Sequence, residues 1–178
     1  MTDLTLTLEA FALNARVNDF LIGRLTPDDL TLSDGRGGMT VARMLSHMGA
    51  SRGGWLLEMA PGFAASTLAL TGGENPWRWH TTDPALLRAM LRAGDEAALQ
   101  AVQAHAASGT PFADPHGAGT FHTRPALFLT YMTVHDAGHR GQIVTLLRHA
   151  GASPERLDEL EDTWAIWRRP LSLPQETA

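Results

Sequence analysis

Four long stretches of the chain repeat their apolar residues at the spacing of an α-helix, and this pattern constrains the fold more than any other feature. The stretches cover residues 4–25, 41–59, 84–107 and 123–150, and their apolar positions recur every three or four residues. A shorter stretch at 155–167 has the same character. No stretch alternates apolar and polar residues as a half-buried strand does. We therefore predict an all-α fold: a four-helix bundle with a short C-terminal helix.

The boundaries of these stretches carry residues that begin or end helices. Thr40 and Asp83-Pro84 are expected to cap the second and third helices, because such side chains accept hydrogen bonds from free helix N–H groups. Pro27, followed by two aspartates, is expected to end the first helix. Residues 62–82 form a long connection. Its length suits a crossover along the bundle or a loop that covers a site.

The length of 178 residues matches one domain. We expect the bundle to occupy residues 1–168, followed by a loose tail at 169–178. The N-terminus lacks the basic segment of a signal peptide. The charge-free stretch at 59–73 is too short, and too rich in glycine, to span a bilayer as a helix. The sequence thus predicts a cytoplasmic protein with no membrane partner.

The composition excludes several kinds of chemistry. The chain has no cysteine, which excludes a disulfide framework, a thiolate nucleophile, a zinc ribbon and an iron–sulfur cluster. All 14 basic residues are arginine, so no lysine is present to form a Schiff base or a phosphate-binding P-loop. The net charge of −5 provides no basic field for nucleic acid. Any metal ion would need ligands from histidine, aspartate, glutamate or water.

One pair of histidines has the spacing of metal ligands. His135 and His139 lie one turn apart on the apolar face of the last long helix, so their Cβ atoms are within about 6 Å of each other. Two imidazoles at that distance can share one metal ion. His47 on the second long helix is the candidate for a third ligand, because bundle metal sites draw ligands from facing helices. In the alternative interpretation, these histidines are only hydrogen-bonded to polar neighbours.

Four further polar residues are candidates for supporting roles. Asp136 and Gln142 are expected to orient the imidazoles from behind. Arg140 either forms an ion pair or contacts a substrate carboxylate. His80 stands beside two tryptophans in the long connection, where it can face a substrate. The sequence assigns no residue a direct catalytic role.

The sequence around these histidines resembles a known family. Residues 135–143, HDAGHRGQI, are similar to the H-x-x-x-H-R-G-Q-I motif in the last helix of the DinB/YfiT-like superfamily. Residues 41–47, VARMLSH, match the single histidine on the second helix of that superfamily. The resemblance covers nearly the whole chain in helix order. It implies an up-down-down-up four-helix bundle with a long crossover, and a divalent metal ion bound by His47, His135 and His139.

The same resemblance carries an expectation about function. Characterised members are thiol-dependent enzymes, among them S-transferases that use bacillithiol or mycothiol and a mycothiol-dependent maleylpyruvate isomerase. The resemblance therefore implies a metal-dependent enzyme that activates a low-molecular-weight thiol, or water, for transfer to a small electrophile. Zinc or nickel is the expected metal, with iron or manganese as alternatives. A small-molecule substrate and no nucleic-acid partner are expected.

Other interpretations are open from the sequence. A non-catalytic metal-binding stress-response bundle would keep the same ligands without an open pocket. A zincin-like protease would need Asp136 as its base, but Thr145 stands where its third histidine is expected. A di-iron bundle needs several inward glutamates, which are scarce here. Residues 164–167, with two tryptophans and an isoleucine (Trp164, Ile166 and Trp167), either cover the core or join two copies in a homodimer.

Overall fold

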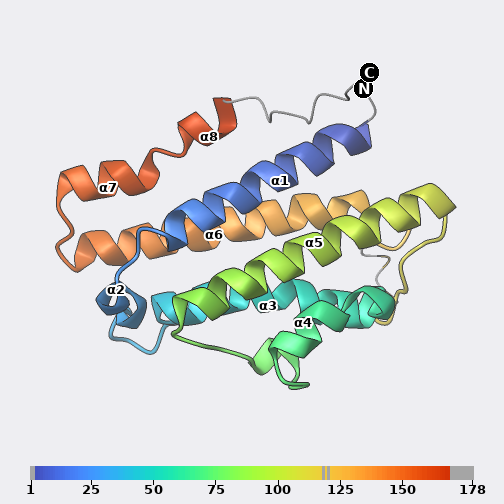
Figure 1. Ribbon diagram of the computed structural model, residues 1–178, viewed down its shortest axis with the longest axis horizontal. Helices are drawn as coiled ribbons and strands as arrows, with labels where there is room; N and C mark the ends of the chain where they lie inside the picture. Colours follow the sequence, from blue (N-terminus) through green and yellow to red (C-terminus); the bar gives the residue numbers. More distant parts are fainter. Residues whose placement is uncertain (1–2, 118, 120, 169–178) are drawn as a thin grey trace.

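The computed structural model describes residues 3–117, 119 and 121–168, and every regular element within them is a helix (Figure 1). The four long helices are α1 (Asp3–Ile22), α3 (Val41–Met59), α5 (Pro84–Ser108) and α6 (Ala126–His149). Short helices lie between and after them: α2 (Pro27–Thr31), η1 (Pro61–Phe63), α4 (Ala65–Leu70), η2 (Pro76–Arg78), α7 (Pro154–Glu161) and α8 (Trp164–Arg168). The prediction of an all-α fold is confirmed.

The predicted helix caps are present at the second and third long helices. The Thr40 hydroxyl accepts a hydrogen bond from the backbone N–H of Arg43 at 3.1 Å, and the Asp83 carboxylate accepts one from Ala85 at 2.8 Å. The first long helix ends at Ile22, and Pro27 begins α2 instead of only ending α1. The reason is a capping box around that proline, in which the side chains of Thr26 and Asp29 accept each other's backbone N–H.

Two other predicted boundaries differ from the structure. The long connection contains three short helices, so it is not a structureless loop. The last long helix begins at Ala126, three residues later than predicted, because Pro125 occupies its N-cap. The C-terminal stretch divides into α7 and α8 around Asp162. The predicted tail at 169–178 lies outside the described residues. No described helix is both long and apolar enough to cross a membrane.

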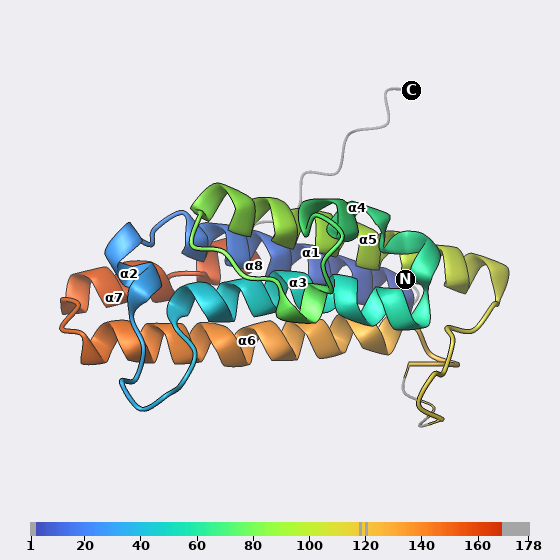
Figure 2. The same cartoon turned by 90° about the horizontal axis from the view of Figure 1, so that it is seen from below.

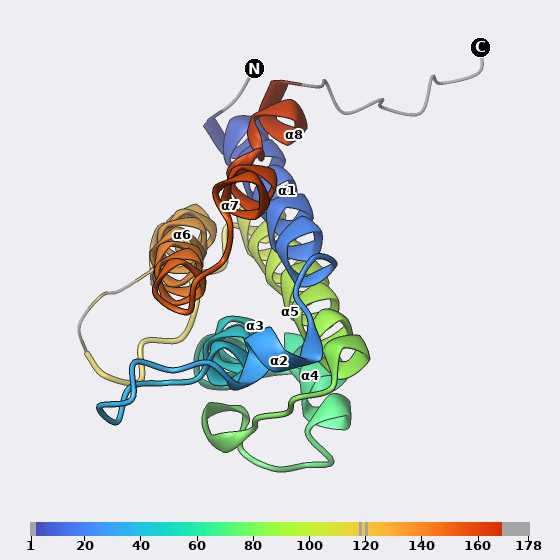
Figure 3. The same cartoon turned by 90° about the vertical axis from the view of Figure 1, so that its left-hand side faces the viewer.

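The four long helices enclose a core that is divided along its length. Figure 3 views them from one end, and Figure 2 shows α3 and α6 side by side over most of their length. One apolar cluster includes Leu21, Leu45 and Ile143, and the other is built around Phe11 and Phe128. Between the two clusters, each long helix contributes buried polar residues. This polar layer lies directly beside the candidate site.

Three glycines of α3 mark close contacts with other elements. A Cβ atom added at Gly49 would lie 2.9 Å from Met90 of α5, and one at Gly53 would lie 2.5 Å from Thr67 of α4. At Gly54 the added atom would lie 2.4 Å from the indole ring of Trp77. These contacts explain why α3 keeps residues that weaken a helix. The short helices of the connection can therefore lie directly on the backbone of α3.

Gly54→Ala is expected to lower the free energy of unfolding by about 1–3 kcal/mol, because the added methyl group must displace the Trp77 ring. Gly138→Ala is the matched control on α6, since no atom lies within 4 Å of its added Cβ. There the higher helix propensity of alanine should raise the free energy of unfolding by up to about 1 kcal/mol. Urea denaturation followed by circular dichroism measures both changes. Equal effects of the two substitutions would contradict the close contact at Gly54.

Candidate metal centre

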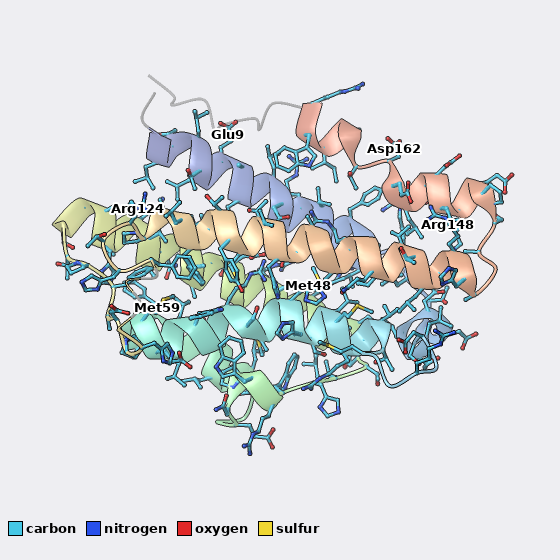
Figure 4. All side chains as sticks on the ribbon, turned by 180° about the vertical axis from the view of Figure 1, so that it is seen from behind. Glu9, Met48, Met59, Arg124, Arg148 and Asp162 are labelled. Atoms are coloured by element: carbon cyan, nitrogen blue, oxygen red, sulfur yellow. The ribbon has the colours of Figure 1, made fainter. Side chains whose placement is uncertain are left out.

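The three predicted histidines lie together between α3 and α6. His47 comes from the middle of α3, and His135 and His139 come from successive turns of α6. The Nε2 atoms of His47 and His135 are 3.1 Å apart. One ring nitrogen from each of the three histidines lies within 4.8 Å of the other two. Figure 4 labels Met48, the neighbour of His47, near the middle of α3.

The spacing of the His47 and His135 nitrogens fits one shared metal ion. Two nitrogens that each lie about 2.0–2.1 Å from an ion, in tetrahedral or octahedral geometry, are about 2.9–3.4 Å apart. The separation of 3.1 Å between His47 and His135 falls within this range. The three ring centroids are 4.6 to 5.2 Å apart, so the rings converge without stacking. An all-imidazole donor set suits zinc, nickel, copper or iron.

Gln142 orients one imidazole from behind, and Asp136 lies behind a second one. The Oε1 atom of Gln142 lies 2.8 Å from Nδ1 of His139. A carbonyl oxygen only accepts hydrogen bonds, so Nδ1 carries the proton and Nε2 keeps its lone pair. A carboxylate oxygen of Asp136 lies 3.6 Å from Nδ1 of His135, which is buried and has no closer partner in the described part of the chain. Both residues therefore lie where the sequence predicted, on the far side of the imidazoles.

Asp136 also belongs to a buried network that joins all four long helices. Arg52 of α3 is completely buried; its Nη2 lies 2.6 Å from Asp136 of α6, and its Nε lies 2.6 Å from Asp95 of α5. Asn14 and Asn18 of α1 each donate a hydrogen bond to Asp136 at 2.7 Å. These side chains form the polar layer between the two apolar clusters. His135 is thus backed by groups from every long helix.

The charges in this layer depend on one another. Burial alone would raise the pKa of Asp136, but the charge of Arg52 and hydrogen bonds from Arg52 and Asn18 hold that pKa well below its usual range. Burial raises the pKa of Asp95 to about 6, against the attraction of Arg52. The pKa of Arg52 is raised, because both carboxylates outweigh the effect of its burial. At neutral pH the layer therefore keeps Asp136 ionised behind His135.

Arg140 completes the network from the next turn of α6 after Asp136. Its Nη1 donates to the side-chain oxygens of Asn14 and Asn18 at 2.7 and 2.5 Å. The two roles considered from the sequence were an ion pair and a substrate contact. Arg140 instead fixes the two asparagine amides, so that their NH₂ groups point toward Asp136. In this structure Arg140 therefore holds residues of the polar layer, and the substrate contact stays a prediction.

Two histidines of the triad, His47 and His139, favour their neutral forms. Burial lowers the pKa of His47 to about 4, and the positive charges of His135, His139 and Arg43 act in the same direction. Burial is also the main reason that the pKa of His139 is lowered. A histidine must be neutral to bind a metal ion. Both residues are therefore ready to act as ligands at neutral pH.

These pKa values predict how acid affects the metal-free protein. The unfolded chain takes up a proton at His47 near pH 6.5, whereas the folded chain does so only near pH 4. The free energy of unfolding should therefore fall as the pH is lowered through this window, because the unfolded state binds more protons. Urea denaturation with a chelator present, at several pH values from 8 to 4, measures the change. His47→Gln should show a smaller fall, and an equal fall in both proteins would contradict the assignment.

The other predicted candidates lie apart from the triad. His80 is exposed in the connection before α5 and does not belong to the histidine cluster. Asp136 is held by Arg52, so it is not free to act as the base of a zincin-like protease. The hydroxyl of Thr145 donates to the backbone of Gly141. The cluster contains no carboxylate ligand among the residues described, which disfavours a di-iron site.

One histidine of the triad, His139, lines a groove on the surface. This groove has a volume of about 700 Å³ and lies between residues 34–39 and the C-terminal half of α6. His139 and Gln142 form part of its wall. A second hollow, of about 730 Å³, lies between α1 and α5 and includes Ile166, but no triad histidine lines it. The groove at His139 therefore provides the route to the candidate metal centre.

The polar layer was not predicted, although the sequence contains a signal for it. Arg52 lies in register with the apolar residues Leu45, Met48 and Leu56 on the buried face of α3. Asn14 and Asn18 are likewise one turn apart on the apolar face of α1. A charged residue on an apolar face needs a buried partner of opposite charge. Asp95 and Asp136 satisfy this need, but their helices could not be aligned from the sequence.

Comparison with known proteins adds to this geometry. The family model described as DinB family matches residues 1–170. No curated protein and no solved structure matches the chain. The matched range includes both segments that hold the triad. The chain belongs to the DinB family.

Proposed function

We propose that the protein is a metal-dependent enzyme that activates a low-molecular-weight thiol, or water, for transfer to a small electrophile. In this proposal His47, His135 and His139 bind one divalent ion, zinc or nickel. The observation that carries the proposal is that His139 lines the groove, so that the triad can be reached by a substrate. Three protein ligands leave a coordination position open, as in catalytic sites, whereas structural sites are closed by four.

The residues around the triad would support this chemistry. When bound by three neutral imidazoles, a divalent ion lowers the pKa of a thiol or water attached to it. Gln142 keeps the lone pair of His139 Nε2 directed into the site, and the carboxylate of Asp136 lies on the far side of His135. The chain has no cysteine, so the sulfur must come from a cosubstrate. Its thiol proton passes to solvent, an S–C bond forms, and the leaving group departs with the electron pair.

We also propose that the four long helices form the up-down-down-up bundle of the family. The proposal is supported by the 24-residue segment between α3 and α5, which is long enough to return along the bundle. It is also supported by the colours in Figure 1, which run in one direction along α3 and α5 and in the other along α1 and α6. This arrangement would bring the two ligand-bearing helices, α3 and α6, side by side.

Two measurements on untagged protein test the proposed function. Elemental analysis should find one equivalent of zinc or nickel. The metal-loaded protein should then consume a thiol from a panel of bacillithiol, mycothiol and cysteine when an electrophile is supplied, and His139→Ala should lose this activity. Absence of metal, even after incubation with zinc or nickel, would refute the metal centre. Bound metal without consumption of any thiol and without hydrolysis would favour the non-catalytic bundle.

A further inference from the structure

The walls of the groove at His139 are mainly apolar. Met39, Met44 and Leu146 line it together with the triad histidine. The side chain of Met39 is 44% exposed although it belongs to the apolar part of the wall. The volume of about 700 Å³ lies within the range of pockets that bind small molecules. An apolar surface that is open to solvent beside a candidate metal centre suits an apolar ligand.

Two glycines of α6 keep this wall open. Gly138 and Gly141 lie on either side of His139 and both line the groove. Glycine is the poorest helix former after proline, yet no atom lies within 4 Å of a Cβ added at either position. The glycines of α3 are different, because the packing of the chain itself requires them. Nothing inside the described chain requires Gly138 and Gly141, whereas a ligand in the groove would need the space they leave.

In the metal-free protein, the charges around the groove disfavour an anionic ligand. Asp34 is the only acidic residue in its wall, His149 also lines it, and no arginine does so among the described residues. The Asp34 carboxylate accepts hydrogen bonds from the backbone N–H groups of Arg36 and Gly38, which lower its pKa. Asp34 is therefore ionised at neutral pH and repels an anion. The Thr145 hydroxyl already donates to the backbone of Gly141, so its proton is not available to a ligand.

We propose that this groove binds the uncharged, mainly apolar body of the electrophile, and that Gly138 and Gly141 leave the room for it beside His139. The inference rests on the proposed function and names the substrate class for the same site. A substrate in this position has its reactive end at the triad and its apolar body along Met39, Met44 and Leu146. A bulky side chain at Gly141 should therefore exclude the substrate without touching a metal ligand.

The test uses NMR spectroscopy of the full chain and does not depend on activity. Benzyl alcohol and 1-hexanol are the probes, and benzoate and hexanoate are their anionic counterparts. Titration of the uncharged probes should shift the amide signals of Gly138, Gly141 and Thr145 and the methyl signal of Met39. In the metal-free protein the anions should bind more weakly, because Asp34 repels them and no bound cation attracts them. Gly141→Leu should weaken binding of the uncharged probes about tenfold or more, the scale on which small changes in an apolar pocket act.

Gly62→Leu is the matched control, because Gly62 lies in η1 and also has no atom within 4 Å of an added Cβ. Gly141→Ala is a milder second variant if the leucine disturbs folding, and should weaken binding less. Equal binding to wild type, Gly62→Leu and Gly141→Leu, or stronger binding of the anions, would overturn the proposal. Cobalt(II) absorption measured on the same samples tests the metal centre separately. If the uncharged probes did not bind in the groove while cobalt still bound to the triad, only the proposed substrate site would be refuted.

Discussion

Replacing Arg52 with methionine is expected to lower the free energy of unfolding by about 3–5 kcal/mol, out of the roughly 5–15 kcal/mol that stabilises a typical domain. Methionine has a similar length and keeps the packing of α3. It removes, however, the cation that contacts both Asp95 and Asp136 at 2.6 Å. Two buried carboxylates would then face each other without compensation. Urea denaturation of the metal-free protein measures the loss.

A triple variant separates the effect of unpaired charges from the effect of changed side-chain volume in Arg52→Met. Arg52→Met with Asp95→Asn and Asp136→Asn removes the whole set of charges, and such replacements are often neutral or stabilising. The triple variant should therefore regain most of the stability lost in Arg52→Met. It should still bind zinc about 10–100-fold more weakly than wild type, the usual effect of removing a partner behind a ligand. A cost below about 1 kcal/mol for Arg52→Met would contradict the network.

Substitution of any one histidine of the triad by alanine is expected to abolish most metal binding. Each of His47, His135 and His139 supplies one nitrogen to the same point, so two ligands remain in every single variant. The affinity for zinc should fall by more than the about 10–100-fold expected when only a supporting residue is lost. Competition with a chromophoric chelator at pH 7.5 measures these affinities. The helical content should not change, because none of the three side chains is fully buried.

Two further variants serve as comparisons for the three histidine substitutions. Gln142→Ala removes only the acceptor at His139 Nδ1, so its affinity should lie between wild type and His139→Ala. His80→Ala removes an exposed histidine outside the cluster and should bind zinc like wild type. If the three triad variants retained full metal occupancy, the triad would be wrong. If His80→Ala also lost metal, the loss could not be assigned to the triad.

Much of the architecture follows from patterns within single segments. The periodicity of apolar residues predicted the four long helices, and the spacing of His135 and His139 predicted a pair on one face of α6. Local capping also explains the main errors: Thr26 and Asp29 form a box that starts α2, and Pro125 delays the start of α6. These features depend on interactions across three residues or fewer, which periodicity alone does not reveal.

The polar layer required information of another kind. Arg52 and its two carboxylates are separated by 43 and 84 residues in the sequence, and many other acidic residues could have been its partners. Which acid meets Arg52 depends on how the helices are aligned along their axes. The resemblance to a family connected His47 to His135 and His139, but it carried no information about the residues behind them.

The alignment of the helices is itself a consequence of the polar layer. Leucine and methionine side chains tolerate sliding of one helix along another, because apolar contacts have little direction. The hydrogen bonds of Arg52 are directional, and a shift of one residue moves a helix by about 1.5 Å. Such a shift would leave buried charges without partners among apolar side chains. We therefore expect the polar layer to disfavour bundles in which one helix is shifted along its axis. Folding would then place His47 at the same height along the bundle as His135.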